Sequence, residues 1–485
     1  MNPRAMNRRT HRPDGHRRRG FVLVGVLIVV MLLSMIALSL MFRMRSEETA
    51  AATGSTAEQA WAAAMSGVRE AMRVASSLAP GDTGWMDAPE RFKDRVLHDD
   101  GAEEWRWTLY SPNPEGGIRF GPTDEASKLN LNSASTSMVS RLPAMKASLT
   151  DALLDFVDAD DMPRPEGAEQ EYYDALSQPY RIPNGPLATV EQLLLVRGFT
   201  PAVVLGEDAN RNFSLDPNED DGDEREPPDD ADGRLQAGLL PLVTVYSREP
   251  NTDRGGKPRF HLNRPGASVT ETNDLPQAFV AFVAALGASQ SVVADPAELL
   301  DATLPLKATD GQQLAVPTGV GKDSLALVLD RFSGTDRPEL VGRINVNTAP
   351  AQVLQLVPGI DNALAESILS ARRNLPAERR QSVAWLHVEN LVEAEKFREI
   401  APFLTTRSLQ FSFHVVGYGS RSGRFRVLEA VIDAAVRPVR LVYLRDLTRL
   451  GLPFPIALDE GPGEAMAAGP DDGGAGRAGN GSPRP

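Results

Sequence analysis

An uninterrupted apolar run near the amino terminus constrains this chain more than any other feature of its sequence. Residues 21–42 read FVLVGVLIVVMLLSMIALSLMF, in which only Gly25, Ser34 and Ser39 are not apolar. At about 1.5 Å of rise per residue, a helix of this length crosses a hydrocarbon layer of roughly 30 Å. The run is also longer than the apolar core of a cleaved secretory signal. The sequence therefore predicts one membrane-spanning helix.

Basic residues flank this run unequally. Seven arginines precede residue 20, opposed only by Asp14, whereas Arg43 and Arg45 follow the run. The excess of positive charge predicts a cytoplasmic amino terminus, with the bulk of the chain on the far side of the membrane. We therefore expect a single-pass membrane protein whose body lies outside the cytoplasm. An ordinary signal anchor is the plainer alternative on hydropathy alone.

The charge and composition of the body argue against several function classes. The formal net charge is -14, and without the basic leader the remainder is more acidic still. An acidic body repels nucleic acid. The chain has no cysteine and therefore no thiolate chemistry, and its histidines do not fall at zinc-ligand spacing. With no G-x-S-x-G or Walker A sequence either, we expect no enzyme activity.

The segments at the two ends of the body predict an α+β fold. Residues 43–78 read as a continuation of the apolar helix, with an apolar stripe at spacings of three and four. Residues 105–110 and 117–120 show strand-type residue usage, and 409–436 reads as a late hairpin. The stripe consists of Trp61, Met65, Val68 and Met72. We expect it to pack on a small antiparallel sheet.

An internal repeat lies between these segments. The sequence KLNLNSAS at 128–135 is echoed by RINVNTAP at 343–350, and each copy is followed by helical runs. Asn132 and Asn347, or Ser133 and Thr348 directly after them, are candidate N-caps of the helices that follow. The second copy continues as LQLVPGI at 354–360, which resembles a helix-hairpin-helix, a fold that often binds DNA backbones. One possible function is therefore that of a membrane-anchored adaptor or DNA-binding protein with helix-hairpin-helix modules. Such a protein would keep its amino-terminal leader uncut, and it is the alternative to the function considered below.

A candidate calcium loop begins at Asp208. Oxygen-bearing side chains occupy positions 1, 3, 5, 7, 9 and 12 of an EF-hand-like loop, where calcium takes its ligands. They are Asp208, Asn210, Asn212, Ser214, Asp216 and Glu219. Phe213 stands at position 6, where glycine is usual, and Pro217 interrupts an exit helix, so the loop is EF-like and not an EF-hand. A solvated acidic linker is the alternative.

The junction before the apolar run resembles a prepilin signal. Arg17, Arg18 and Arg19 precede Gly20 and Phe21. The resemblance implies that a prepilin peptidase cuts between Gly20 and Phe21 and that the new amino terminus of Phe21 is methylated. Most pilins carry a glutamate at the fifth mature position, where this chain has Gly25.

The body resembles one pilin family in particular. The runs DEASKLNLN at 124–132, LDFVDAD at 154–160, EGAEQEYY at 166–173, YRIPNGPL at 180–187 and the second copy at 343–360 are similar to the minor pseudopilin K of type II secretion systems. That family implies an α+β pilin fold whose sheet is interrupted by an inserted helical domain, SAM-like or helix-hairpin-helix-like, in two repeats. It further implies bound calcium and a place at the pseudopilus tip. The implied partners are minor pseudopilins of the I and J types, prepilin peptidase, secretion channel components and the bacterial inner membrane, with no nucleic acid.

Together these features predict eight segments. They are a leader (1–20), a transmembrane part of the pilin helix (21–42), a periplasmic helix with the first strands (43–127), a first helical repeat with the acidic loop (128–234), an insertion of unassigned role (235–342), a second helical repeat (343–407), returning strands (408–450) and a disordered tail (451–485).

Overall fold

A computed structural model describes residues 19–78, 81–114, 116–222, 224–225, 227–269, 274–307 and 312–456. The chain forms two compact units, residues 1–59 and 60–485. The predicted leader lies outside the described residues up to position 18. The second unit contains the sheet, both repeats and the segment between them.

A single helix, α1 (Arg19–Ser77), carries the apolar run. Its stretch Val22–Glu48 is long and apolar enough to cross a membrane, with a mean hydropathy of 2.9. The apolar side chains from Val22 to Met44 are exposed in the isolated chain, as lipid-facing residues would be. The predicted cleavage site, Gly20 and Phe21, lies in the first turn of α1. The expected amino-terminal apolar helix is thus confirmed.

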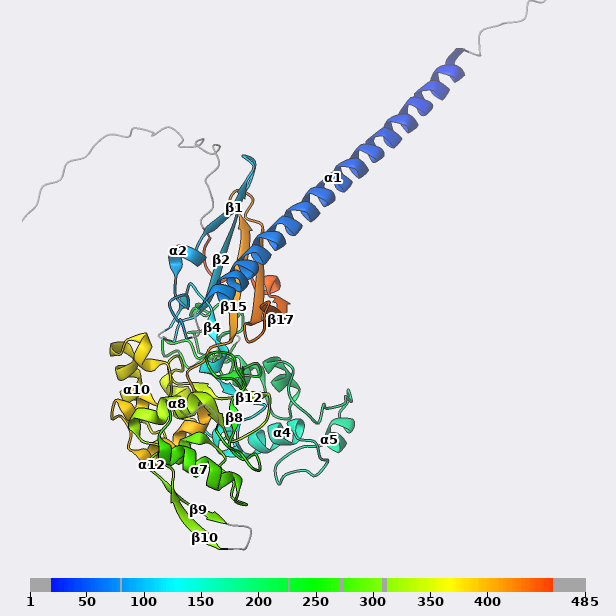
Figure 1. Ribbon diagram of the computed structural model, residues 1–485. Helices are drawn as coiled ribbons and strands as arrows, with labels where there is room; N and C mark the ends of the chain where they lie inside the picture. The colour runs from blue at the N-terminus through cyan, green and yellow to red at the C-terminus, as the bar shows by residue number, and fades with distance from the viewer. Residues whose placement is uncertain are drawn as a thin grey trace, which may run out of the picture. The chain divides into compact units, whose positions relative to one another are not determined.

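The second unit is built on an antiparallel sheet in the order β1-β2-β15-β16-β17, with β3 on β2 and β4 on β15 (Figure 1). The strands are β1 (Arg95–Asp99), β2 (Glu104–Pro112), β3 (Ile118–Arg119), β4 (Thr123–Asp124), β15 (Gln410–Gly419), β16 (Phe425–Asp433) and β17 (Arg440–Asp446). The early strands β1 and β2 meet the late strands β15, β16 and β17 at the centre of the sheet, because β2 pairs with β15. The mixture of helices with this sheet confirms the predicted α+β class.

The carboxyl-terminal part of α1 packs on this sheet at very close range. Of the predicted stripe, Val68 is fully buried, while Trp61, Met65 and Met72 are partly buried against the same core. Gly417 on β15 allows the approach, because a Cβ there would lie 2.3 Å from the Ala64 nitrogen of α1. The short helix α2 (Pro89–Phe92) adds Phe92 to this core.

The two sequence repeats fold into similar arrangements inserted between β4 and β15. In the first copy β5 (Leu129–Asn130) pairs in parallel with β6 (Val243–Thr244). In the second, β13 (Ile344–Asn345) pairs in parallel with β14 (Leu404–Thr405). In the first copy, the helices between the paired strands are α3 (Thr136–Val139), α4 (Ala147–Val157), α5 (Gln170–Asp174), η2 (Val190–Leu195) and α6 (Pro201–Val204). In the second copy they are α9 (Ala351–Leu354), α10 (Asn362–Asn374), η4 (Ala377–Arg380), α11 (Trp385–Val388), α12 (Ala394–Ile400) and η5 (Ala401–Phe403).

The repeated asparagines do not cap helices, so that prediction was wrong. The residue before α3 is Ser135 and the residue before α9 is Pro350, and neither side chain caps its helix. The Asn132 amide instead donates to the Leu187 carbonyl, and the Asn347 amide donates to the Arg380 carbonyl. Each asparagine therefore forms a hydrogen bond that connects the start of its repeat to a later segment of the same repeat.

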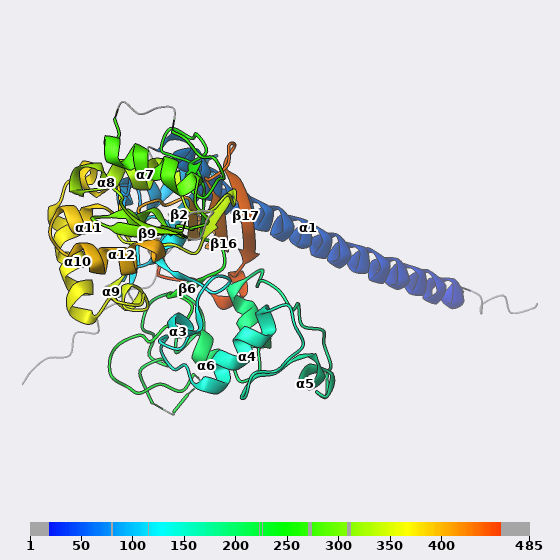
Figure 2. The ribbon, with the colours of Figure 1, turned by 60° about the horizontal axis from the view of Figure 1, so that its bottom comes forward.

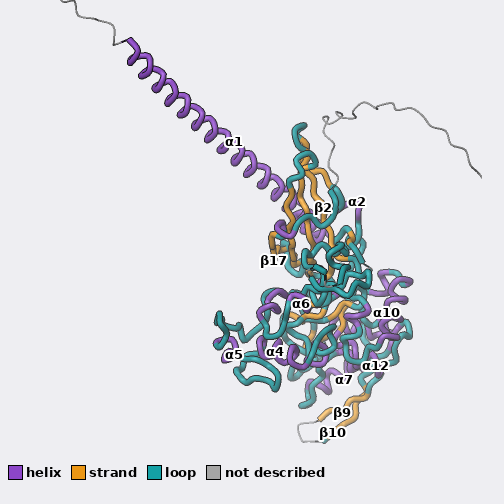
Figure 3. The backbone as a smooth tube through the Cα atoms, turned by 180° about the vertical axis from the view of Figure 1, so that it is seen from behind, coloured by secondary structure: helices purple, strands orange, loops and turns teal. Residues whose placement is uncertain are grey.

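The segment between the copies packs into the same hydrophobic core as both of them. Its elements are β7 (Arg248–Pro250), β8 (Phe260–His261), α7 (Gln277–Gly287), η3 (Pro296–Leu299), β9 (Thr303–Lys307), β10 (Gln313–Pro317), α8 (Lys322–Arg331), β11 (Phe332–Ser333) and β12 (Glu339–Val341). Figure 2 shows α7 and α8 beside α9 to α12, while α3 to α6 gather separately. Loops make up much of the inserted region (Figure 3). The insertion is therefore one cored body, not a chain of independent modules.

The ordered chain continues past the last predicted strand. After β17 and the turn η6 (Thr448–Leu450), the Phe454 ring packs edge-on against Tyr110 of β2, with centroids 5.3 Å apart. Residues 451–456 therefore belong to the folded body, whereas the predicted disordered tail otherwise falls outside the described residues.

The close approach of α1 to the sheet generates a prediction. Gly417→Ala should destabilise the folded body by about 2 kcal/mol, because the added methyl group overlaps backbone atoms that have no room to move. The measurement is denaturant unfolding of the full-length protein in detergent, followed by tryptophan fluorescence. Gly54→Ala is the matched control, because open space surrounds that helical glycine and alanine favours helix. Equal stability of the two variants would contradict the packing described here.

Candidate functional site

The structure gathers the predicted calcium ligands into one closed loop. The Asp216 Oδ2 atom accepts hydrogen bonds from the side-chain amides of Asn210 at 2.6 Å and Asn212 at 2.8 Å. The Asp208 carboxylate accepts from the backbone N–H groups of Asn212 and Phe213. These bonds bring side chains from both halves of the predicted loop into contact.

The turn that an EF-like loop needs forms without the usual glycine. Phe213, at position 6, has a φ of +63°, in the left-handed region that glycine adopts most readily. Its ring stacks on His414 at 4.9 Å and meets Tyr110 edge-on at 6.3 Å. Burial of the ring against the sheet compensates for the strained backbone. The phenylalanine that weakened the sequence match thus has a packing role.

Glu219, the last predicted ligand, is buried with unused hydrogen-bonding capacity. Its side chain is 2% exposed, and Oε2 accepts a hydrogen bond from the Asp216 N–H. Its Oε1 atom has no partner within the part of the chain that the structure describes. Burial raises the pKa of Glu219 to about 7 and that of Asp208 to about 6. A hard cation such as calcium would stabilise the charged form of both carboxylates.

Ser214 completes the predicted set. Its backbone N–H donates to the Asn212 side-chain oxygen at 2.7 Å, which orients the Ser214 peptide within the loop. In loops of this kind, position 7 contributes a main-chain carbonyl, a role that does not depend on the serine hydroxyl. The residues present therefore fit a calcium ion, with Asp208, Asp216 and Glu219 as the charged ligands.

A buried arginine, which the sequence analysis did not single out, fixes the loop to the sheet. Arg211 is 5% exposed and forms ion pairs with Glu429 of β16 at 2.6 Å and with Glu191 of η2 at 3.3 Å. Its partners lie 218 and 20 residues away in the sequence. No local pattern identifies such pairs, so only the folded structure shows them.

Arg372, in the helix α10 that follows the LQLVPGI motif of the second repeat, forms hydrogen bonds within the protein. Arg372 donates to the backbone carbonyls of Val346 and Ala349, which lie at the start of the same repeat. Burial lowers the pKa of Arg372 to about 10. Its guanidinium therefore stabilises the repeat and is not displayed to a phosphate backbone.

The Arg211 contacts yield a stability prediction. Arg211→Met should destabilise the protein by about 3 kcal/mol, because the largely buried Glu429 loses its arginine partner, while Glu191 still pairs with Arg445. Arg225→Met is the control, since Arg225 is 61% exposed and pairs with Asp221 at the surface, where ion pairs contribute little. Thermal melts of the full-length variants measure both effects. A control that melts as low as Arg211→Met would contradict the anchoring role.

One segment of the chain matches a known protein family. Residues 127–206, which span the first repeat up to the acidic loop, match the family model described as "Type II secretion system (T2SS), protein K". Among solved structures, the chain is similar to a chain of the GspK-GspI-GspJ complex from enterotoxigenic Escherichia coli, with 14% identity, coverage of 83% of this chain and 99% of that chain, and a TM-score of 0.39. The comparison with curated proteins gave no match. Residues 127–206 are thus the part of the chain that is similar to protein K of the type II secretion system.

Proposed function

We propose that this chain is the minor pseudopilin K of a type II secretion system and that it works by assembly, without catalysis. The match of residues 127–206 to protein K carries the proposal. That segment is inserted in an antiparallel sheet that packs on a long helix, and the first part of that helix can span a membrane. The solved complex contains GspK with GspI and GspJ, and we infer partners of the I and J types here.

Gly25 bears on the position of the chain in a filament. It occupies the place where most pilins carry a glutamate, and an unpaired charge inside the membrane is costly. A subunit without that carboxylate cannot neutralise the amino terminus of a subunit ahead of it. It fits the filament tip, where no subunit lies ahead. The inserted repeats would then cap the filament in the periplasm and face the secretion channel.

Processing of the amino terminus tests the proposal. The native protein should begin at N-methylated Phe21, because prepilin peptidase would cut after Gly20 and remove the basic leader. The position of the amino terminus and its methylation are measured by intact mass spectrometry and amino-terminal sequencing. The protein is purified from a strain in which prepilin peptidase is active. Gly20→Val should block the cut, whereas Gly25→Ala, within the apolar run, should leave it unchanged. A native chain that keeps its leader would favour the unprocessed adaptor instead.

We further propose that the acidic loop binds calcium through Asp208, Asn210, Asn212, Asp216 and Glu219, with the main-chain carbonyl of Ser214. The buried, unpartnered Oε1 atom of Glu219 supports this assignment most directly. An ion there would neutralise carboxylates that otherwise repel one another and would order the loop against the sheet. Its role is structural.

Removal of calcium provides the corresponding test. The full-length protein should melt at a higher temperature in Ca²⁺ than in chelator, since an ion at 100 times its dissociation constant stabilises by about 2.7 kcal/mol. The double substitution Asp208→Asn with Asp216→Asn should reduce this difference. Glu224→Gln, an exposed change in the same acidic stretch, should preserve it. An undiminished calcium effect in the double variant would refute the assignment of the loop.

A further inference from the structure

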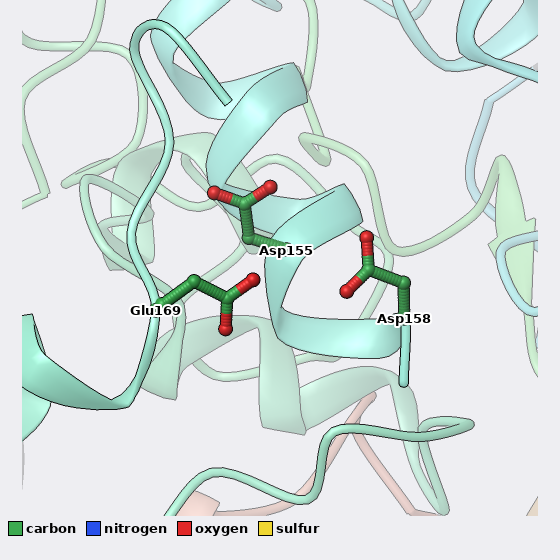
Figure 4. A group of neighbouring side chains, drawn as sticks. All are labelled: Asp155, Asp158 and Glu169. Atoms are coloured by element: carbon green, nitrogen blue, oxygen red, sulfur yellow. The ribbon is translucent and has the colours of Figure 1, made fainter. Parts of the chain in front are cut away.

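The inserted body contains a basic cavity as well as acidic clusters. In the first repeat, Arg164 pairs with Asp155 and Asp158. Glu169 belongs to the same group, in which carboxylates predominate (Figure 4). The balance is reversed in a cavity of about 60 Å³ that lies where the segment between the repeats meets the second repeat. There, four arginines face three carboxylates, in a chain whose net charge is -14.

The charged groups of this cavity come from segments that are far apart in the sequence. Two arginines lie between β7 and β8, one directly precedes β13, and one follows β14. The arginines are Arg254, Arg259, Arg343 and Arg407, and the carboxylates are Glu249, Asp295 and Asp330. Arg343 pairs closely with Asp295, at 2.6 Å. The other ion pairs between these groups have N–O distances of 3.6 to 3.9 Å, longer than a hydrogen bond.

Arg259 has no carboxylate partner among the residues that the structure describes. It is partly buried, and its Nε atom donates to the Asp330 backbone carbonyl at 3.0 Å. Its terminal nitrogens have no acceptor within the same described residues. Burial lowers the pKa of Arg259, and the neighbouring Arg407 and Arg343 lower it further. A buried charge without a counterion is costly, so this guanidinium calls for an anion that the protein itself does not provide.

Arg407 and two serines add unused donors to the cavity. The Arg407 Nη1 atom donates to the Pro250 carbonyl at 3.4 Å, whereas its buried Nη2 atom has no hydrogen-bond partner in the described part of the chain. Ser333 and Ser382 also line the cavity, and each hydroxyl oxygen accepts a backbone N–H. Each hydroxyl proton therefore remains available for donation. The cavity is lined by donors that lack an acceptor.

We propose that this cavity binds a singly charged oxyanion of the carboxylate class, held by Arg259 and Arg407 with the hydroxyls of Ser333 and Ser382. A planar guanidinium presents paired N–H donors that match the two oxygens of a carboxylate. Four arginines against three carboxylates leave one positive charge in excess, which suits a monovalent anion better than a phosphate dianion. A water molecule needs about 10–15 Å³, so the cavity has room for a group of a few heavy atoms.

The anion would connect the segment between the repeats to the second repeat, since its ligands come from both. This role would give the segment 235–342 a function in binding. The cavity lies outside residues 127–206 and outside the acidic loop. The proposal therefore does not depend on the similarity to protein K or on calcium.

Calorimetric titration of the full-length protein in detergent tests the site, with sodium acetate as the probe and ionic strength held constant with sodium chloride. Acetate should bind with a dissociation constant of about 1 mM, in the range expected of so small a ligand. Arg259→Gln should weaken binding by about tenfold or more, because the unpaired guanidinium is lost. Arg337→Gln is the matched control, since Arg337 is exposed in the same segment and does not line the cavity, and it should leave the affinity unchanged.

The carboxylate could come from a free small molecule or from the end of a polypeptide chain. N-acetylalanine and its amide separate these sources. Tighter binding of N-acetylalanine than of acetate would indicate a polypeptide carboxylate, whereas equal binding would indicate a free anion. The amide carries no negative charge and should not bind; binding of the amide as tight as that of the acid would overturn the proposal.

Asp330→Asn provides a change of opposite sign. It removes a carboxylate that lies 3.7 Å from the Arg407 Nη2 atom, while the backbone carbonyl that holds Arg259 remains. Acetate should then bind several-fold more tightly, a gain that misfolding cannot produce. Absence of acetate binding to the unsubstituted protein would overturn the site, as would full affinity after Arg259→Gln. Weaker binding after Asp330→Asn would also overturn it, since the carboxylate would then support the ligand instead of competing with it.

Discussion

The pairing of β2 with β15 is the contact on which the rest of the body depends. These strands are about 300 residues apart in the sequence, yet they lie side by side with Trp107 opposite Gly417. The pairing closes the sheet from both ends of the chain and so makes everything between β4 and β15 an insertion with fixed ends. Loop-closure entropy rises only slowly with length, so a cored insertion of this size is tolerated.

A second set of buried contacts joins the insertion to the sheet. Asp124 of β4 accepts hydrogen bonds from Asn345 and Thr348 of the second repeat and from Ser408 just before β15. The next residue, Glu125, accepts from Thr244 at the end of the first repeat. Asp124 therefore accepts hydrogen bonds from the second repeat, and Glu125 accepts one from the end of the first. These bonds connect both repeats to the same edge of the sheet.

The sequence predicted the features that depend on local periodicity or composition. The apolar helix, the strands around Trp105 and the late hairpin follow from side-chain patterns of 3.6 and 2 residues. It also located the paired repeats, because the copies share residues. It misread Asn132 and Asn347, since an asparagine before a helix suggests a cap, whereas their partners lie 55 and 33 residues away. Tertiary partners of this kind leave no local signature.

The candidate calcium loop shows the same difference between features that have a local sequence pattern and features that depend on tertiary packing. The spacing of oxygen side chains marked the loop from Asp208 to Glu219, but the left-handed backbone of Phe213 depends on packing against Tyr110 and His414. The loop leaves the buried Glu219 Oε1 atom without a partner among the residues that the structure describes.

The acidic loop lies in a stretch with little regular structure, between α6 and β6. A stretch of this kind has few backbone hydrogen bonds to oppose its conformational entropy, and repulsion between carboxylates disfavours a compact form further. A cation bound by several carboxylates replaces their mutual repulsion with attraction to a shared positive charge. It thereby connects segments that have no helix or strand between them. Ion binding would therefore act on the same loops that give the inserted body its shape, and the stability of the body would follow the calcium level of its compartment.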